Sequence, residues 1–205
     1  VVFGALAAAF AWRSMFRSTA EVPRPHPTAV MASSSDQPGA SLMGHQRYDE
    51  APRHDLNPVI PGSYVLMRPA AATAFRLMQH AAASDGIDLN PVSGFRSIDQ
   101  QRELFFEVKA ERSQSVAQRA RVSAPPGYSE HHTGYALDIS SSQCRGLSEE
   151  FENTRAFRWL EENASRYHFE MSFPRNNPYG IAYEPWHWRF MGDDHSLQTF
   201  SKVAR

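Results

Sequence analysis

Apolar residues recur at helical spacing in the stretch that follows Pro69. Those that would share one face of a helix are Ala71, Phe75, Met78 and Ala82. Pro69 suits the first position of a helix, and Gly86 suits the position just past its C-terminal end. The pattern therefore predicts a helix over residues 69–84.

Two further helices are expected downstream. Ser97 and Gln100 have the spacing of a capping box, in which each side chain bonds the backbone amide of the other residue. A helix would therefore start there and run to about Arg112. Its buried stripe would consist of Leu104, Phe105 and Val108. A third helix is expected over residues 154–167, with Ala156, Leu160 and Ala164 on one face.

Shorter apolar stretches between these helices predict strands. They lie at residues 88–93, 135–140, 169–173 and 182–190, and a turn is expected at 175–180. Residues 113–128 are polar and then proline-rich, which predicts a long loop. Strands and helices are mixed without a regular βαβ repeat. The order favours an α+β fold with a small, mainly antiparallel sheet and flanking helices.

The N-terminal part of the chain shows neither a helical nor a strand period. Residues 1–12 form an apolar run that is too short to span a membrane, and it suits an export signal or the remnant of a membrane anchor. Residues 13–44 are rich in Ser, Ala and Pro, so we expect a flexible linker. The folded domain would then cover residues 45–205 of a protein exported to the periplasm or cell envelope.

The composition of the 205-residue chain restricts its chemistry. A formal net charge of −1 gives no argument for a nucleic-acid partner. The single cysteine, Cys144, excludes both an intramolecular disulfide and a zinc cluster built on thiolates. Any metal ion must therefore be held by histidine and carboxylate side chains. We expect a monomer.

The first stretch with candidate metal chemistry is residues 129–138. His131 and Asp138 lie on either side of Gly134, where a tight turn could direct both side chains toward one point. Taken alone, the pair is more often a loop histidine and an aspartate at the end of a strand. The stretch therefore needs a partner elsewhere in the chain.

The second stretch is residues 184–188, which contains Glu184 and His187. Residues three apart point to opposite faces of an extended strand, so a bulge or half-turn around Pro185 would be needed to bring both into one cavity. Together the two stretches offer two imidazoles, one ligating carboxylate and one spare carboxylate. A hydrolytic zinc centre needs this set: three protein ligands, an open position and a base beside it.

These motifs resemble those of the VanY-type D-alanyl-D-alanine carboxypeptidases, zinc peptidases whose fold is shared with the Hedgehog signalling domain. The matching motifs are Ser129-x-His131-x-x-Gly134-x-Ala136-x-Asp138, Glu184-x-x-His187, and the earlier Ser93-Gly94-Phe95-Arg96-Ser97 with Gln101. They occur in the order of the family and cover roughly residues 48–192. One departure is His168, at a position where many relatives carry glycine, so that turn could differ.

The resemblance implies a role for each matching residue. Zn²⁺ would be bound by His131, Asp138 and His187. Glu184 would be the catalytic carboxylate. Arg96 would act in catalysis and in substrate binding, by reaching the C-terminal carboxylate of the substrate or the developing oxyanion. Gln101 and Ser129 would complete the substrate pocket.

The function implied by the resemblance is removal of the C-terminal D-amino acid, D-Ala, from peptidoglycan stem peptides by attack of a metal-activated water. A D,D-dipeptidase and an L,D-carboxypeptidase of the same family remain open as alternatives. A non-catalytic, zinc-stabilised module that binds the cell wall is a third. The presence of Glu184 and Arg96 argues against that module, because a structural zinc site has no use for a base.

Overall fold

The computed structural model describes residues 41–201 of the chain. The apolar run at 1–12 and most of the expected linker lie outside these residues, as do positions 202–205. Residues Ser41–Leu42 (β1) and His45–Gln46 (β2) pair as an antiparallel hairpin, so the last four positions of the expected linker belong to an ordered element. Within the described residues, no helix has the length and apolar character needed to cross a bilayer.

A four-stranded antiparallel sheet lies at the centre of residues 41–201, in the order β5-β6-β8-β7. Its strands are β5 (Asn90–Ser93), β6 (Ala136–Ser140), β8 (His187–Phe190) and β7 (Phe169–Met171). A smaller antiparallel pair consists of β3 (Asn57–Pro58) and β4 (Leu66–Met67). The predicted α+β class with a small antiparallel sheet is confirmed.

The last predicted strand, 182–190, is wrong in its first half. Only its final four residues form β8, because a tight turn precedes them. In that turn the backbone N–H of His187 donates to the carbonyl of Glu184 at 3.1 Å. The half-turn expected around Pro185 is therefore present, and it ends where the strand begins.

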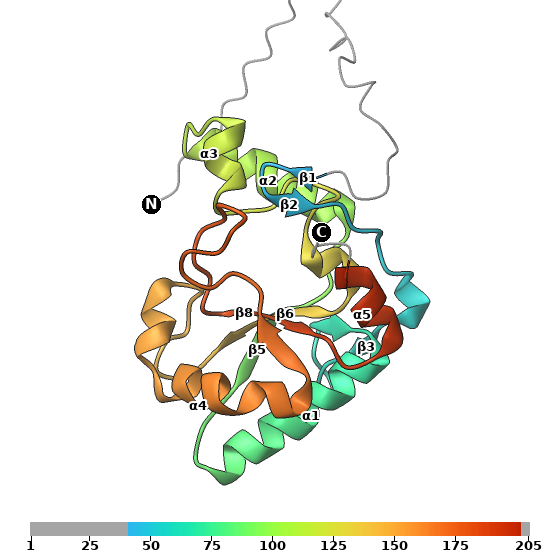
Figure 1. Ribbon diagram of the computed structural model, residues 1–205, viewed down its shortest axis with the longest axis vertical. Coiled ribbons are helices and arrows are strands. Elements are labelled where there is room, and N and C mark those ends of the chain that lie inside the picture. Colours follow the sequence, from blue (N-terminus) through green and yellow to red (C-terminus); the bar gives the residue numbers. More distant parts are fainter. Residues whose placement is uncertain (1–40, 202–205) are drawn as a thin grey trace, which may run out of the picture. The chain divides into compact units, whose positions relative to one another are not determined.

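Two of the predicted helices cover one face of the sheet (Figure 1). The first, α1 (Pro69–Ser84), has the predicted bounds and buries all four residues of its expected apolar face. The other is α4 (Arg155–Asn163), continued by the 3-10 turn η4 (Ala164–Tyr167), so the helix predicted for 154–167 changes type near its end. His168 then takes a left-handed φ of 62°, the conformation that glycine adopts most easily, so the turn keeps this form without glycine.

The helices α2 (Ile98–Glu111) and α3 (Val116–Ala120) lie on the other side of the sheet, together with the β1–β2 hairpin (Figure 1). The capping box of Ser97 and Gln100 is present at the start of α2. The predicted loop at 113–128 is wrong in part, because it contains α3, which begins with a second capping box.

The expected buried stripe of α2 is also wrong in part. Phe105 is 1% exposed, but Leu104 is 37% exposed and Val108 is half-buried. The reason is the position of the helix. Instead of packing on the main core, α2 borders a cavity on the far side of the sheet, and these two side chains line it.

Several short elements complete the fold. They are the 3-10 turns η1 (Arg53–Asp55), η2 (Glu130–Thr133) and η3 (Glu149–Asn153), and the final helix α5 (Asp194–Ser201). The sequence patterns did not predict α5. Its Phe200 is 2% exposed and makes edge contacts with the rings of Tyr48 and Tyr135.

The two faces of the central sheet have different roles. Leu137 on β6 and Trp188 on β8 belong to the hydrophobic core beneath the sheet. Side chains alternate along a strand, so their neighbours Asp138 and His187 point to the opposite face. The fold therefore places the polar residues of the two motifs on the face that α1 and α4 do not cover.

Candidate metal centre

Asp138 and His187 are brought together by the register of the sheet. They are directly opposite each other in the antiparallel pairing of β6 with β8. Cross-strand partners have their Cβ atoms about 5 Å apart, so facing side chains meet. Here Nδ1 of His187 lies 3.1 Å from Oδ1 of Asp138.

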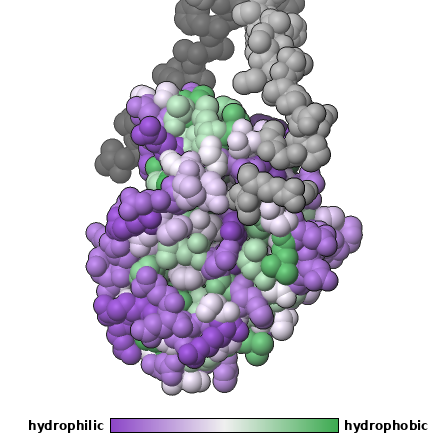
Figure 2. Space-filling model, in the orientation of Figure 1, coloured by the Kyte–Doolittle hydropathy of each residue, from purple (hydrophilic) through white to green (hydrophobic). Residues whose placement is uncertain are grey.

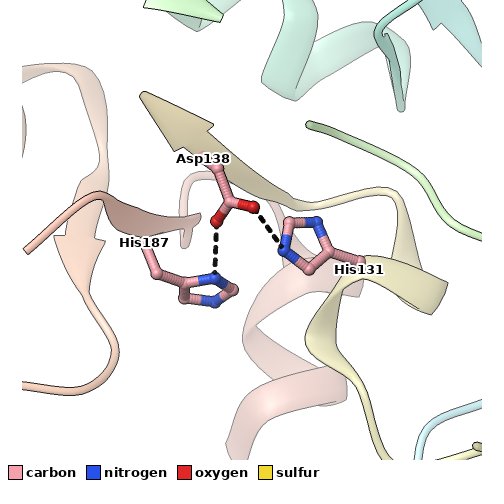
Figure 3. A group of neighbouring side chains, drawn as sticks. All are labelled: His131, Asp138 and His187. Atoms are coloured by element: carbon pink, nitrogen blue, oxygen red, sulfur yellow. Dashed lines mark hydrogen bonds and ion pairs between the residues drawn. The ribbon is translucent and has the colours of Figure 1, made fainter. Parts of the chain in front are cut away.

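His131 reaches the same point from the η2 turn. The hydroxyl of Ser129 accepts the backbone N–H of His131 at 3.3 Å. Gly134 ends the turn with a φ of 72°, and a Cβ at this position would lie 2.8 Å from the side chain of Leu56, so glycine is favoured here. The turn places Nε2 of His131 3.3 Å from Oδ2 of Asp138 (Figure 3).

Each imidazole is held by a second hydrogen bond at its other nitrogen. Nδ1 of His131 lies 2.7 Å from the carbonyl of Gly94, to which it donates, so that Nε2 keeps its lone pair. Nε2 of His187 lies 2.9 Å from Oε2 of Glu130, and a proton donated there leaves the lone pair on Nδ1. The two free nitrogens and the carboxylate oxygens of Asp138 therefore face one another.

This donor set fits zinc. One ligand atom from each of His131, Asp138 and His187 lies within 4.8 Å of the others, and the three residues are at most 5% exposed. Two imidazole nitrogens and one carboxylate oxygen are a common set of protein ligands at catalytic zinc sites. Partners that fix the ring orientation of each histidine, as Gly94 and Glu130 do here, are typical of such sites.

The electrostatics of the cluster favour a positive charge. Burial by itself would lower the pKa of His187, but hydrogen bonds to Asp138 and Glu130 raise it to about 10. Burial would raise the pKa of Glu130, but its contacts with His187 and Arg189 lower it to about 2. Carboxylates therefore surround the point where the ligand atoms converge, and a cation bound there would take the place of the proton on His187.

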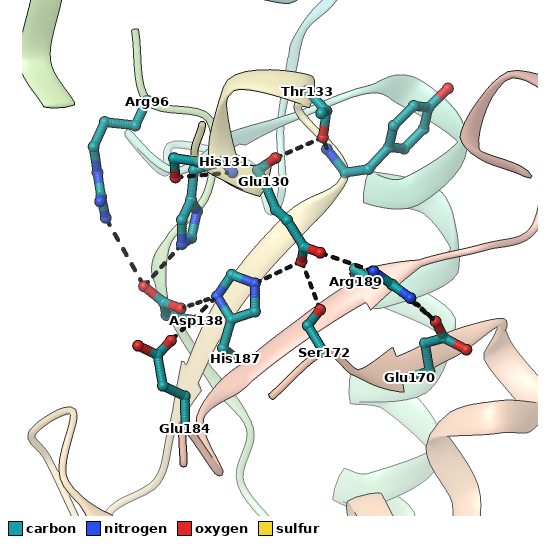
Figure 4. Close-up of polar contacts among 12 residues, drawn as sticks. Arg96, Glu130, His131, Thr133, Asp138, Glu170, Ser172, Glu184, His187 and Arg189 are labelled. Atoms are coloured by element: carbon teal, nitrogen blue, oxygen red, sulfur yellow. Dashed lines mark hydrogen bonds and ion pairs between the residues drawn. The ribbon is translucent and has the colours of Figure 1, made fainter. Parts of the chain in front are cut away.

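Glu130 is a functional residue that the sequence motifs missed. Its carboxylate is 5% exposed and accepts three side chains: Nε2 of His187, the hydroxyl of Ser172 at 2.6 Å, and the guanidinium of Arg189 at 2.8 Å (Figure 4). Arg189 is two residues after His187 on β8 and so shares its face of the sheet. The position of Arg189 two residues after His187 in the sequence was a signal that a carboxylate partner lies near both side chains.

Glu184 lies beside the candidate metal ligands. Its Oε2 is 3.9 Å from Nδ1 of His187, and 14% of its side chain is exposed. No hydrogen bond to its carboxylate is present within residues 41–201. The pKa of Glu184 is raised to about 7, chiefly by burial. The nearby carboxylates of Asp138 and Glu130 contribute to the rise, and the opposing charge of His187 limits it.

Arg96 is held against the same cluster. Its guanidinium donates to Gln101 and to Ser93, both at 2.8 Å, and lies 3.9 Å from Oδ2 of Asp138. The amide of Gln101 donates in turn to Ser123 and to the carbonyl of Ala124. Gln101 is 1% exposed, so its visible role is to position Arg96.

The other candidate residues lie around the same space. Ser129 is 4% exposed and caps the turn that carries His131. His132 follows His131 in the chain and binds backbone groups instead of facing the cluster. One of its ring nitrogens contacts the carbonyl of Arg96 at 2.7 Å, and the other accepts the N–H of Gly127 at 3.1 Å.

Every predicted site residue lines one cavity of about 380 Å³: Arg96, Gln101, Ser129, His131, Asp138, Glu184 and His187.

The α+β fold with this cluster on the open face of its sheet has the architecture of the Hedgehog and D,D-peptidase type. Residues 64–193 match the family described as VanY, D-alanyl-D-alanine carboxypeptidase. This match covers more than half of the chain, and the chain belongs to the VanY family. The resemblance noted in the motifs is confirmed.

Two curated relatives illustrate the similarity in sequence. A putative carboxypeptidase, YodJ, of Bacillus subtilis is 40% identical over 129 residues, which are 62% of this chain and 46% of the relative. A D-alanyl-D-alanine carboxypeptidase of Enterococcus faecium is 34% identical over 137 residues, which are 65% of this chain and 40% of the relative. The chain thus spans less than half the length of these two relatives.

Solved structures show the same fold. The LdcB LD-carboxypeptidase superposes with a TM-score of 0.61 at 33% identity, over 74% of this chain and 73% of that one. A vancomycin-resistance D,D-pentapeptidase VanY, solved in complex with Zn(II), gives a TM-score of 0.56 at 27% identity, over 75% of this chain and 85% of that one. The predicted fold family is therefore confirmed.

Proposed function

We propose that the protein is a zinc-dependent carboxypeptidase that removes the C-terminal D-Ala from peptidoglycan stem peptides. One observation carries the proposal. The free ring nitrogens of His131 and His187 and the carboxylate of Asp138 face one point, beside the unbonded carboxylate of Glu184. Membership of the VanY family supports the substrate class.

The geometry divides the work of peptide hydrolysis among the residues. A zinc ion held by the three ligands would supply Lewis-acid chemistry, which polarises a carbonyl and acidifies water. Glu184 would accept a proton from the attacking water and return it to the leaving amine. A carboxylate whose pKa is about 7 suits both transfers near neutral pH.

Arg96 would bind the free carboxylate at the end of the substrate. A guanidinium matches the two oxygens of a carboxylate with its fork of donors. Gln101 and Ser93 hold this fork in place before any substrate arrives, so little ordering is needed on binding. A cationic group at this position would select substrates with a free C-terminus, as an exopeptidase does.

The proposal also covers the location of the protein. Its substrate lies in the cell envelope, so the protein would be exported and residues 1–12 would be the export signal or the remnant of an anchor. We propose that it acts as a monomer, because one chain supplies all three metal ligands and the adjacent base. Cell fractionation with an antibody against the folded domain tests the location.

A direct assay tests the reaction. The purified protein is loaded with Zn²⁺ and incubated with a synthetic stem pentapeptide, and the released fragment is identified by mass spectrometry. We expect release of a single D-Ala that stops when zinc is removed with a chelator. Release of the dipeptide would instead identify a dipeptidase.

A tetrapeptide substrate forms the second arm, because an LD-carboxypeptidase is among the similar structures. Cleavage of the tetrapeptide alone would identify an L,D-carboxypeptidase. Stoichiometric zinc without cleavage of either peptide would overturn the proposal and favour the non-catalytic module.

A further inference from the structure

Apart from Gln101, which holds Arg96, one wall of the cavity has no role in the reaction described so far. It is formed by α2, α3 and the segment after them, and it carries two arginines, Arg112 and Arg119. Apolar side chains lie beside them: Leu104, Val108 and Val122. Figure 2 shows hydrophobic and hydrophilic surface side by side at the end of the described domain where α2 and α3 lie.

Arg119 is largely buried and has no ion-pair partner in the described part of the chain. It is 6% exposed, and its Nε is buried with no hydrogen bond. No acidic side chain of residues 41–201 forms an ion pair with it. A buried cation without a paired anion costs stability, so such a group is rarely left unpaired unless a ligand completes it.

Arg112 adds a second positive charge to the same wall. It is exposed at the end of α2, and no ion pair with it is present in the described part of the chain. Both arginines line the same cavity. Burial lowers the pKa of Arg119, and the positive charge of Arg112 lowers it as well. Two cations that repel each other here would both gain from a shared anion.

The acidic residues of the cavity are not available to these arginines. Glu130 is bonded to His187 and Arg189, Asp138 is bonded to the two histidines, and Glu184 lies 3.9 Å from His187. None of the three forms an ion pair with Arg112 or Arg119 within residues 41–201. The anion must therefore come from outside the described chain. A carboxylate is the ligand that a pair of guanidiniums recognises best in a peptide, through paired N–H···O bonds.

We propose that Arg119 and Arg112 form a carboxylate-binding subsite for an acidic group of the substrate upstream of the scissile bond. Arg96 is already positioned beside Asp138 for the terminal carboxylate, whereas this pair belongs to other elements. The preferred substrate is then an acidic peptide with two carboxylates, one terminal and one upstream. This inference rests on the proposed function, because it adds to the substrate of the same cavity.

Matched peptides test the subsite. In each pair one peptide carries a free carboxylate upstream of the scissile bond and the other carries the carboxamide of the same shape, and the pairs place this group at successive upstream residues. For at least one pair, kcat/KM with the wild-type protein should favour the carboxylate by about tenfold or more, the range of a charge-assisted hydrogen bond. The substitution R119Q should lower this ratio to near one through KM.

Two further variants keep the test independent of folding at the buried position. R112Q changes an exposed residue and should lower the ratio severalfold. R158Q is the matched control, because Arg158 is an exposed helical arginine that does not line the cavity, and it should leave the ratio unchanged. Equal kcat/KM for both members of every pair with the wild-type protein would overturn the subsite and leave the proposed function intact.

Calorimetric binding to the zinc-loaded protein separates the two proposals. If no peptide is cleaved, the proposed function fails. The subsite is still supported if the protein binds the carboxylate peptide more tightly than its carboxamide partner. Equal affinity for the two peptides overturns the subsite. A third peptide, with an amidated C-terminus and an upstream carboxylate, distinguishes the source of the anion. Binding of this peptide that R119Q weakens supports the upstream group, and binding that R119Q leaves unchanged assigns the pair to the terminal carboxylate and overturns the proposal.

Discussion

The catalytic cavity has two walls that differ in how their polar groups are paired. On the sheet wall, the side chains of His131, Asp138 and His187 are buried and each has partners on its own chain. On the wall formed by α2 and α3, Arg119 is nearly as buried but its guanidinium has no partner within residues 41–201. Leu104 on the same wall stays 37% exposed.

The difference separates side chains that the fold has already oriented from side chains that it leaves unpaired. Groups that hold a metal ion must be oriented before the ion arrives, so the fold fixes both nitrogens of each imidazole. Groups that recognise a substrate can bind it only if their hydrogen-bonding positions are not already occupied. A wall with an unpaired guanidinium therefore suits substrate recognition. Changes on the sheet wall should therefore affect metal binding and catalysis strongly, and changes on the helical wall should affect them weakly.

The largest effect is expected for H187A. This change removes one proposed metal ligand and leaves Asp138 and Glu130 without their shared partner, so zinc should be lost and kcat/KM should fall by about 10⁴-fold or more. Zinc content by atomic spectroscopy and peptide assays measure both. H54A is the control, because His54 is exposed and lies outside the cavity. A variant of His187 that kept full zinc content would remove this residue from the site.

Glu184→Ala should separate chemistry from metal binding. Glu184 is beside the three ligands and not among them, so zinc should be retained, while kcat/KM should fall by about 10² to 10⁴, the range of general acid–base catalysis. The same zinc and peptide assays apply. Turnover at the wild-type rate would contradict the assignment of the base.

Glu130→Gln tests the residue behind His187. The change removes the negative charge that accepts the Nε2 proton and keeps the shape, so zinc affinity should fall by about 10- to 100-fold. Competition with a chromogenic chelator measures it. Glu170→Gln is a matched control, since Glu170 also pairs with Arg189 but is about half exposed and does not contact His187. Equal zinc affinity of E130Q and wild type would show that His187 needs no such partner.

The smallest effect is expected for Val116→Ser in α3, one of the helices that form the helical wall. Val116 is 41% exposed at the start of α3 and does not line the cavity. The free energy of unfolding should change by no more than about 0.5 kcal/mol, as for most exposed sites. Urea denaturation of the zinc-loaded protein measures it. A loss above about 1 kcal/mol would show that α3 supports the fold more than its exposure indicates.

Local signals made much of the secondary structure predictable. The helix at 69–84 has the expected bounds, and the cap formed by Ser97 and Gln100 is present. The same signature at Ser115 and Gln118 went unused, although it marks the start of α3. The strand expected from residue 182 was too long, because the half-turn expected around Pro185 precedes His187 and the strand begins only after it.

The sequence by itself determined which residues could form the metal site and the order in which their motifs occur. The tertiary structure decided which nitrogen of each histidine faces the ion and which groups hold it there. The reason is distance along the chain: a helix cap joins residues three apart, but Gly94 and His131 are 37 positions apart and Glu130 and His187 are 57 apart. Such bonds exist only after the sheet has formed, and so does the cavity that encloses the unpaired charge of Arg119.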